Sequence, residues 1–355
     1  MANAPDLFPG PCVYVDDFAR GFTRKKRGDA FVYTTHKGAK VRAEKTIARL
    51  NAVGLPPAYE DAWYCNNPRG HIQALGTDAK GRRQYRYHPG FRSEAEDAKF
   101  AALPAFAKAL PGIRAHAERA LARRDLSRER VVAAVVRLLD IGHVRVGNKQ
   151  YARDNKSFGA TTLKTRHAKV GRDMLRLDFM GKSGKRHQIA IGDRRLASLA
   201  RQCSDLPGQP LFQYLDAEGV PRPVDSSDIN AWLKETGADF TAKTFRTWHA
   251  SVIAYTALAN RGGAAKLKEV LGEVSAKLGN TPAVARKSYV HPALIDVMTG
   301  AREWDPAWNI RRRATRWLTR DERGFVAVLD ALAAEATAAT ADTDDTPASP
   351  ASASA

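Results

Sequence analysis

The chain has little cysteine and no long apolar run, and both absences narrow the classes of protein to which it can belong. Its 355 residues include three cysteines, Cys12, Cys65 and Cys203, which are far apart and lack C-x-x-C spacing. This pattern indicates neither a disulfide framework nor a zinc site, and it fits a reducing cytoplasm. No apolar stretch approaches the ~20 residues of a membrane helix, and the N-terminus does not resemble a signal peptide. The sequence therefore predicts a cytoplasmic protein without a membrane partner.

Acidic residues are outnumbered by basic ones along the whole chain. Lysine and arginine total 57 against 38 aspartates and glutamates, which gives a net charge of +19. The excess is spread along the sequence and is not confined to one tail. Such a spread is typical of a broad basic face that binds a polyanion such as DNA, although a merely soluble basic protein would have it too.

The first part of the chain predicts a small β-rich domain over residues 19–92, after a flexible N-terminus at 1–18. Residues 81–88, GRRQYRYH, alternate long basic and aromatic side chains as a two-faced strand does. Further strand-like runs and one helix are expected at 31–41, 61–67, 71–78 and, for the helix, 43–54. The run at 31–41 has a polar His-Lys-Gly turn at its centre, which favours two short strands.

Residues 93–335 predict a second, mostly helical domain, so that the fold class is α+β. Helical periodicity begins near residue 94, with breaks expected at Pro104 and Pro111. Other helices are expected at 128–142, 194–203, 226–237, 245–260, 265–279 and around residue 289. A three-stranded sheet is expected from 163–170, 174–181 and 185–191. Residues 336–355 contain only small, polar and acidic residues and proline, which predicts a disordered tail.

A late tyrosine and three upstream cations carry the chemistry that the sequence suggests. Tyr289 lies in ARKSYVHP, and Arg145, Lys182 and Arg246 precede it in distinctive local strings. Tyrosine can attack a phosphodiester and keep the bond energy in a phosphotyrosine ester, while arginines bind phosphate through paired hydrogen bonds. A lysine in the glycine-flanked turn 181–184 can deliver a proton to the leaving oxygen. The set predicts reversible DNA cleavage without ATP, metal or another cofactor.

Each of these residues also has an ordinary structural interpretation. Tyr289 can be a packing residue, Arg145 a surface strand residue and Arg246 a helix cation. The turn around Lys182 fails the G-x-x-x-x-G-K-[ST] spacing of a phosphate loop, so ordinary turn chemistry is the alternative there. Only the order and spacing of the whole set favour catalysis.

Five segments of this sequence resemble type IB DNA topoisomerases of the compact poxvirus and bacterial kind. They are GHIQALGTDAKGRRQYRYHPGFR (70–92), HVRVGNKQYARDNKSFGATTLKTRH (143–167), LDFMGKSGKRH (177–187), KTFRTWHAS (243–251) and GNTPAVARKSYVHP (279–292). The resemblance implies a β-rich domain and a helical catalytic domain that clamp duplex DNA, the latter shared with tyrosine recombinases. It implies a monomer that relaxes supercoiled DNA by single-strand cleavage, strand rotation and religation.

The resemblance also implies a role for each active-site position. Tyr289 matches the nucleophile, Arg145 and Arg246 match the two phosphate-binding arginines, and Lys182 matches the general acid. Lys243 matches a lysine that assists the proton relay.

Asn280 stands where the family often has histidine. Its amide can donate a hydrogen bond to a non-bridging oxygen but cannot be charged.

The resemblance further predicts two groups of DNA contacts. The first, in the β-rich domain, consists of Lys80, Arg82, Arg83, Gln84, Tyr85 and Tyr87. The second consists of Lys149 and Tyr151 in the catalytic domain. Arginines in such positions hold phosphates, and glutamine or tyrosine can reach base edges. The alternative for Tyr85 and Tyr87 is a position in the hydrophobic core.

Two other functions compete with this interpretation. A site-specific tyrosine recombinase would use the same tyrosine, arginines and lysine, but its N-terminal domain is usually helical, and no helix for exchange between protomers is evident after the catalytic domain. A non-catalytic basic DNA-binding protein would not need the active-site set in this order.

Overall fold

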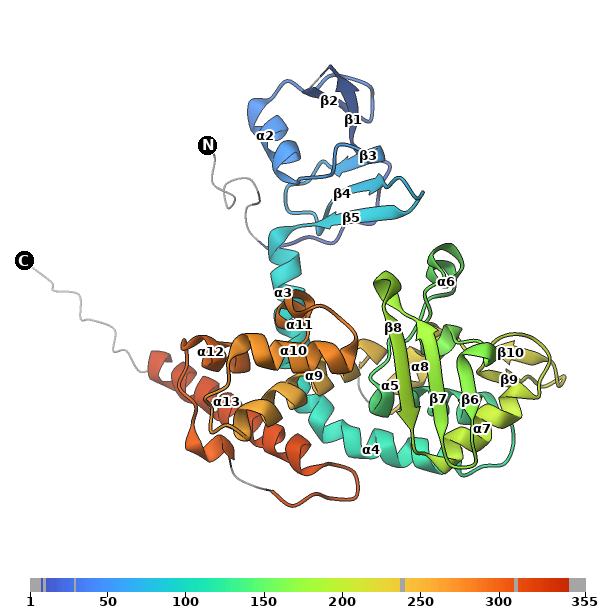
Figure 1. Ribbon diagram of the computed structural model, residues 1–355. Coiled ribbons are helices and arrows are strands. Elements are labelled where there is room, and N and C mark those ends of the chain that lie inside the picture. Colours follow the sequence, from blue (N-terminus) through green and yellow to red (C-terminus); the bar gives the residue numbers. More distant parts are fainter. Residues whose placement is uncertain (1–7, 9–10, 29, 237–239, 310–311, 345–355) are drawn as a thin grey trace, which may run out of the picture. The chain divides into compact units, whose positions relative to one another are not determined.

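The structure is a computed structural model that describes residues 8, 11–28, 30–236, 240–309 and 312–344 (Figure 1). It divides into two compact units, Met1–Lys99 and Phe100–Ala355. The sequence predicted this boundary at residues 92–93, which lie inside helix α3 (Pro89–Ala101). The helix passes through the predicted boundary because no glycine or proline occurs between Gly90 and Leu103 to end it.

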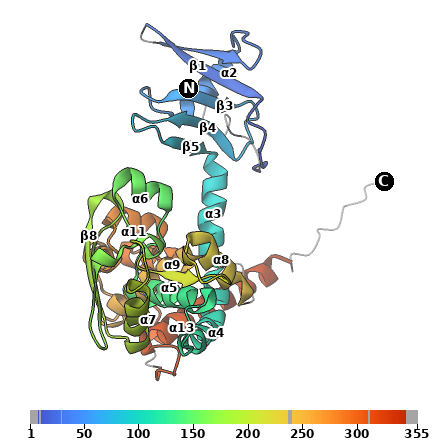
Figure 2. The ribbon, with the colours of Figure 1, turned by 90° about the vertical axis from the view of Figure 1, so that its right-hand side faces the viewer.

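The first unit is a five-stranded antiparallel sheet with one helix packed on it. The strands are β1 (Gly21–Arg27), β2 (Ala30–Thr35), β3 (Glu60–Cys65), β4 (Ile72–Thr77) and β5 (Arg83–Tyr87) in the order β2-β1-β3-β4-β5, and the helix is α2 (Glu44–Ala52). Tyr33, Leu50 and Tyr64 are buried between the sheet and the helix. The predicted β-rich domain is confirmed, and β5 lies at the edge of the sheet, where it leads into α3 (Figures 1 and 2).

The two short strands expected around the turn in 31–41 are partly confirmed, because the first is β2 and the second run forms only a bridge. β2 pairs along its whole length with β1, from Phe22 opposite Thr35 to Arg27 opposite Ala30. Across the turn, Thr34 and Lys40 form an isolated antiparallel bridge, the Thr35 N–H donates to Ala39 O at 2.8 Å, and the Val41 N–H donates to Tyr33 O at 2.9 Å. The sequence of β1, GFTRKKR, hid this strand because its run of cations has no apolar alternation.

The segment expected to be a flexible N-terminus is partly held to the first unit. Val13 pairs with Gly70, its N–H donates to Arg69 O at 2.8 Å, and its carbonyl accepts from His71 N at 2.9 Å. The Val15 N–H donates to His71 Nδ1 at 2.9 Å. Residues 1–7, 9 and 10 lie outside the described residues. For residues 13–15 the prediction of flexibility is wrong, because backbone hydrogen bonds to the β3–β4 loop hold them in place.

The second unit is a helical body that carries two small sheets. Its helices are α4 (Leu103–Leu121), α5 (Arg128–Gly142), α6 (Lys149–Asn155), α7 (Arg194–Ser204), α8 (Ser226–Glu235), α9 (Ala242–Ala259), α10 (Leu267–Leu278), α11 (Pro282–Ser288), α12 (Pro292–Thr299) and α13 (Arg320–Asp344). The larger sheet has the order β6 (Ala168–Val170), β7 (Leu175–Met180), β8 (Arg186–Ile191), and the smaller pairs β9 (Gln213–Leu215) with β10 (Pro221–Pro223). The predicted α+β class is therefore confirmed.

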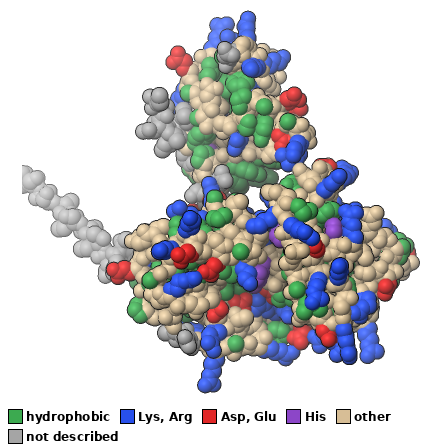
Figure 3. Space-filling model, viewed as in Figure 1, with side chains coloured by type: hydrophobic (Ala, Val, Ile, Leu, Met, Phe, Trp, Pro, Cys, Tyr) green, Lys and Arg blue, Asp and Glu red, His purple; other side chains and the backbone are tan. Residues whose placement is uncertain are grey.

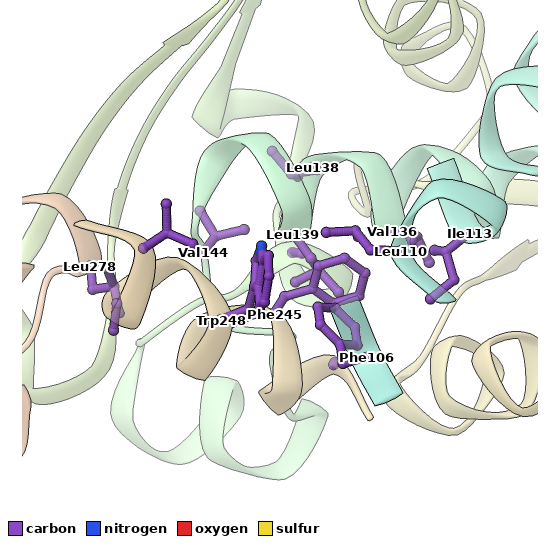
Figure 4. Packing of buried hydrophobic residues seen from close by; sticks show 14 of the residues in the cluster. Phe106, Leu110, Ile113, Val136, Leu138, Leu139, Val144, Phe245, Trp248 and Leu278 are labelled. Atoms are coloured by element: carbon purple, nitrogen blue, oxygen red, sulfur yellow. The ribbon is translucent and has the colours of Figure 1, made fainter. Parts of the chain in front are cut away.

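A single apolar core holds this unit together. Phe106 of α4 meets Phe245 and Trp248 of α9 edge to face, with ring centroids 5.2 and 5.8 Å apart (Figure 4). Leu138 and Leu139 of α5 belong to the same cluster. The core thus holds α9, which carries Lys243 and Arg246, against α4 and α5, and deleting one of its large side chains would cost about 3–5 kcal/mol of stability.

The expected helix break at Pro111 is absent, since α4 runs through this residue. An interior proline removes one backbone hydrogen bond and usually disrupts a helix. Here Leu110 and Ile113, on either side of it, are fully buried, and their packing compensates for the lost bond. The break near Pro104 is confirmed, because this proline lies in the first turn of α4, where its missing N–H has no helical partner to lose.

Two further predictions need correction at strand and helix ends. β6 covers only residues 168–170, because Thr165–His167 forms a 3-10 turn where the sequence predicted strand from residue 163. α13 continues to Asp344, so the disorder predicted from residue 336 is wrong as far as 344. Alanine has the highest helix propensity of all residues, and this part of α13 is rich in it. Residues 345–355 lie outside the described residues.

α13 follows the tyrosine along the chain and lies mostly within the predicted catalytic domain of residues 93–335. Phe325, Val328 and Leu329 of α13 are buried in the core of the same unit. The helix therefore belongs to the body of its own chain.

Candidate active site

Tyr289 is the residue at the end of α11, and its backbone is held from both sides. Its N–H donates to Ala285 O at 3.1 Å, and its side chain is 9% exposed. Ser251 of α9 donates its hydroxyl to Tyr289 O at 3.2 Å and accepts the His291 N–H at 3.0 Å. Sequence reasoning missed Ser251, although it ends the quoted string KTFRTWHAS. The hydroxyl fixes the tyrosine's backbone against α9.

Arg246, also on α9, lies over the face of the Tyr289 ring. The carbon at the centre of its guanidinium is 5.0 Å from the ring centroid. The group is buried, and it donates to His143 O at 2.5 Å and to Leu278 O at 2.9 Å. Its Nε is buried and has no hydrogen-bond partner among the described residues. A buried, fixed guanidinium with a donor to spare is suited to binding an anion beside the tyrosine.

The cations around Tyr289 change its acidity. Burial by itself would raise the pKa of the phenol, whereas the charge and hydrogen bond of Arg246 lower it. Arg145 and Lys243 act in the same direction, and the net result is a pKa below the usual value for tyrosine. A lowered pKa makes the phenolate, which is the nucleophilic form, easier to reach.

Three consecutive carbonyls in the turn between α10 and α11 receive three cations. Leu278 O accepts from Arg246 at 2.9 Å, and Gly279 O accepts from Arg145 Nη1 at 3.4 Å. Asn280 O accepts from Lys185 Nζ at 3.3 Å. The two arginines are close enough that the charge of Arg145, together with burial as the larger cause, lowers the pKa of Arg246. The side chains of Arg246, Arg145 and Lys185 are therefore held close together at residues 278–280.

The Asn280 side chain lies in the same turn and is 7% exposed. Neither its amide nitrogen nor its amide oxygen has a hydrogen-bond partner among the residues that the structure describes. Leaving a buried amide unpaired costs about 1–3 kcal/mol per group. An amide in this condition is suited to a partner that arrives with the substrate.

Lys182 lies in the turn between β7 and β8, and Lys243 lies in the first turn of α9; both are exposed. The β7–β8 turn is tight: Ser183 has a φ of 64°, and the Gly181 N–H donates to Lys185 O at 2.7 Å. Lys185, at the end of the same turn, contacts Asn280 O. The structure thus brings together Tyr289, Arg145, Arg246, Asn280 and Lys243, with Lys182 on a turn joined to the same group.

His187 of β8 is a neighbour of the site that sequence reasoning missed. Its ring stacks on Phe179 at 5.1 Å and fits between two glycines, since a Cβ on Gly279 would come within 2.1 Å of it and one on Gly181 within 2.5 Å. Burial, and then the charges of Arg145, Arg246 and Lys185, lower its pKa to about 4. The neutral imidazole of His187 thus lies between the β7–β8 turn and the α10–α11 turn and sets the distance between them.

The predicted DNA contacts of the first unit lie on or beside β5. Tyr85 and Tyr87 are 44% and 47% exposed, so the alternative of a core position is wrong for both. Their rings stack with centroids 6.2 Å apart. Lys80 and Arg83 are exposed, whereas Arg82 is paired with Asp78 at 2.7 Å and Gln84 donates to the same carboxylate at 2.9 Å.

The second predicted group lies at the start of α6, which the sequence did not predict. The Asn148 side chain caps the helix by accepting from the Tyr151 N–H at 2.8 Å. Lys149 is 3.5 Å from Asp225 but remains largely exposed. Both Lys149 and Tyr151 are therefore accessible at least in part.

Comparison with known proteins identifies the family. Residues 88–300 match the family described as "Eukaryotic DNA topoisomerase I, catalytic core", and residues 30–78 match "Bacterial DNA topoisomerase IB, N-terminal domain". The DNA topoisomerase 1B of Acanthamoeba polyphaga mimivirus is 33% identical over 289 residues, which cover 76% of this chain and 85% of the viral protein. The chain belongs to the type IB DNA topoisomerases. These enzymes are isomerases with DNA as substrate, and membership supports relaxation of DNA by this chain.

Two more distant similarities were found. The DNA topoisomerase 1B of Vaccinia virus (strain Copenhagen) is 22% identical over 247 residues, 68% of this chain and 76% of that protein. The post-cleavage complex of the XerH site-specific recombinase aligns with a TM-score of 0.34 and 14% identity, over 54% of this chain and 51% of the recombinase. The chain thus spans about half of that structure, and a likeness at this level carries no argument about function. None of the helices in the described part of the chain has the length and apolarity needed to span a membrane.

Proposed function

We propose that this topoisomerase relaxes supercoiled DNA through a covalent 3′-phosphotyrosyl intermediate on Tyr289, without ATP or a metal ion. The observation that carries the proposal is the set of groups around this tyrosine. Its pKa is lowered by Arg246 against the opposing effect of burial, and Arg145 contributes to the same shift. Fixed guanidiniums beside a buried phenol are what an in-line attack on a phosphodiester requires.

In the proposed reaction Tyr289 Oη forms a bond to phosphorus while the bond to the 5′-oxygen breaks. Arg145, Arg246 and the Asn280 amide bind the non-bridging oxygens, and Lys182 gives its proton to the departing 5′-oxygen with help from Lys243. The phenol proton passes to solvent. Religation is the reverse: the 5′-hydroxyl attacks phosphorus, and the tyrosine leaves. Between the two steps the cut strand rotates about the intact one, so torsional strain in the DNA drives the change of linkage.

A plasmid assay tests this function directly. The purified chain should relax both negatively and positively supercoiled plasmid in the presence of EDTA and the absence of ATP. Denaturing gels should show the protein on the 3′ end of a nicked strand. If the chain links to the 5′ end, or needs ATP, the proposal is wrong. Strand exchange between two DNA sites instead of relaxation would support the recombinase, and binding without cleavage would support a non-catalytic DNA-binding protein.

We further propose that the chain acts as a monomer on chromosomal DNA in the cytoplasm, with its two units as the two sides of a clamp on the duplex. The broad positive charge supports this proposal, since lysine and arginine side chains are spread over both units (Figure 3). The exposed Tyr85, Tyr87, Lys80 and Arg83 of the first unit then contact one face of the DNA. Lys149 and Tyr151 contact it from the second unit.

Salt dependence should measure these contacts. The logarithm of the binding constant should fall with log salt at a slope of about −0.9 per phosphate contacted. Lys80→Ala and Arg83→Ala should each make the slope shallower by roughly one unit. Arg82→Ala should have a smaller effect, because Asp78 already neutralises this guanidinium. Fluorescence anisotropy on one duplex at several salt concentrations gives the slopes. An unchanged slope for Lys80→Ala and Arg83→Ala would remove both from the DNA face; Arg302→Ala, whose partner is Glu335, serves as control.

Replacing Asn280 should affect the rate more than binding. Its unpaired amide is expected to bind a non-bridging oxygen whose negative charge grows in the transition state. Asn280→Ala should therefore slow cleavage and religation by roughly 10²-fold, about the cost of one lost oxyanion donor. Asn280→His should keep substantial activity and gain a pH dependence near neutrality.

Single-turnover cleavage of a duplex with one cleavage site, together with DNA affinity, provides the measurement for Asn280. Affinity should barely change. If Asn280→Ala cleaved as fast as the unaltered enzyme, residue 280 would serve only to end helix α10.

A further inference from the structure

A network of buried polar side chains links α4, α5, α9 and α13 of the second unit. Asp140 of α5 accepts two hydrogen bonds from Arg114 of α4, at 2.8 and 2.9 Å, and is paired with His249 Nε2 of α9 at 2.9 Å. Arg114 also donates twice to Glu322 of α13, at 2.9 and 2.6 Å. Asp140, Glu322 and His249 are 2%, 3% and 8% exposed. The four side chains thus join four helices through polar contacts.

The network reaches the active site through His143. This residue follows the last turn of α5 and adopts a left-handed conformation, with a φ of 52° and a ψ of 21°. A left-handed residue other than glycine needs support from its surroundings. The His249 ring supplies it, since the two imidazoles pack with centroids 4.4 Å apart. The His143 carbonyl in turn accepts the 2.5 Å hydrogen bond from Arg246.

We propose that His249 is a positioning residue for the cleavage reaction and acts through His143 on the guanidinium of Arg246. Asp140 fixes the orientation of the His249 ring, and Arg114 and Glu322 fix Asp140. The inference rests on the proposed function, in which Arg246 binds the scissile phosphate. His249 itself does not touch the reacting atoms in this proposal.

Stability alone does not account for such a network. Burying charges is costly, and well-packed apolar side chains of similar size often stabilise a core as well or better. α4, α5, α9 and α13 already share a continuous apolar core. What hydrogen-bonded charges add is a defined geometry, because each pair is satisfied in one arrangement only. That geometry is passed to the carbonyl that holds Arg246.

The first test is single-turnover cleavage by His249→Ala on a duplex with one cleavage site. We expect the rate to fall by about 10- to 100-fold, the effect expected of a modest misplacement of a catalytic group. DNA affinity should stay close to that of the unaltered enzyme. The readout that separates positioning from general loss of structure is a double-mutant cycle with Arg246→Lys, a change that removes the two-pronged grip on His143 O and Leu278 O. If His249 acts through Arg246, the double variant should be no slower than Arg246→Lys alone.

Chemical rescue provides a second, independent readout. His249, His143 and Asp140 line a cavity of about 800 Å³. Added imidazole should therefore reach the space left in His249→Ala and restore much of the rate, while leaving the unaltered enzyme unchanged. His249→Phe, which fills the space but cannot pair with Asp140, is the matched control and should not respond.

Three results would overturn the inference: a His249→Ala rate equal to that of the unaltered enzyme, a defect that multiplies fully with that of Arg246→Lys, or no response to imidazole. If His249→Ala does not fold by circular dichroism, His249→Gln and Asp140→Asn preserve volume and should show the same lack of additivity with Arg246→Lys. Failure of the proposed function has a different signature, because the unaltered enzyme itself would then not cleave, and both proposals would fall.

Discussion

Tyr289→Phe should abolish plasmid relaxation and covalent complex formation while leaving DNA binding intact. The substitution removes one oxygen atom, which in the proposed reaction is the nucleophile, and keeps the ring that packs under Arg246. No other group can form the phosphotyrosine ester in its place, so the loss should be complete within the sensitivity of the assay. Relaxation, trapping of the covalent complex by detergent and a binding titration give the three readouts.

The control for this change is Tyr214→Phe, on strand β9 of the same unit, which should relax plasmid normally. Relaxation by Tyr289→Phe at a rate near that of the unaltered enzyme would exclude Tyr289 as the nucleophile.

The lowered pKa of Tyr289 adds a prediction of its own. The cleavage rate of the unaltered enzyme should rise with pH as the phenol ionises, and it should level off below the ~10 of free tyrosine.

Lys182→Ala should slow cleavage of ordinary DNA by roughly 10²- to 10⁴-fold, the range expected for loss of a general acid. The physical reason is that an alkoxide is a poor leaving group until it receives a proton. A 5′-bridging phosphorothiolate removes that requirement, because a thiol has a pKa of about 8.5 and leaves as the thiolate. Lys182→Ala should therefore cleave the sulfur-containing duplex at nearly the normal rate.

Lys185→Ala is a matched control in the same turn. Its ammonium contacts a main-chain oxygen, Asn280 O, at 3.3 Å, and this contact involves no leaving group. Any defect of this variant should be equal on both substrates. If the Lys182→Ala variant had the same defect on oxygen-containing as on sulfur-containing DNA, Lys182 would not be the general acid.

The parts of the fold that the sequence predicted well are those with a clear period. The alternation in 81–88 predicted β5, the strand-like runs 61–67 and 71–78 on either side of a turn predicted β3 and β4, and the apolar run 128–142 with its terminal glycine predicted α5 with its observed bounds. Elements without such a pattern were missed. β1 is a run of cations, and the last part of α13 is rich in alanine and lacks an apolar pattern in its sequence.

The site shows the same division between local and tertiary information. Tyr289 and the cations could be proposed as a site from the sequence because each lies in a short, distinctive string. Their supports were not found, since Ser251, His187 and His249 gain their roles only when α9, β8 and the α10–α11 turn come together. The spacing of residues in the sequence does not indicate which main-chain carbonyl will accept a hydrogen bond from a given arginine. The exposure of Tyr85 and Tyr87 likewise depended on β5 being an edge strand, which alternation alone does not reveal.

The carbonyls of Leu278, Gly279 and Asn280 make the position of the three cations independent of the side chain at residue 280. The three cations are anchored to main-chain oxygens, which are present whatever side chain residue 280 carries. Exchange of asparagine for histidine at this position therefore leaves the arginines where they are and alters only one donor and its charge. In the proposed reaction, an exchange at residue 280 would therefore change how cleavage responds to pH without moving the arginines that are proposed to bind phosphate. Gly279 is the position without such freedom, since any side chain there would collide with His187.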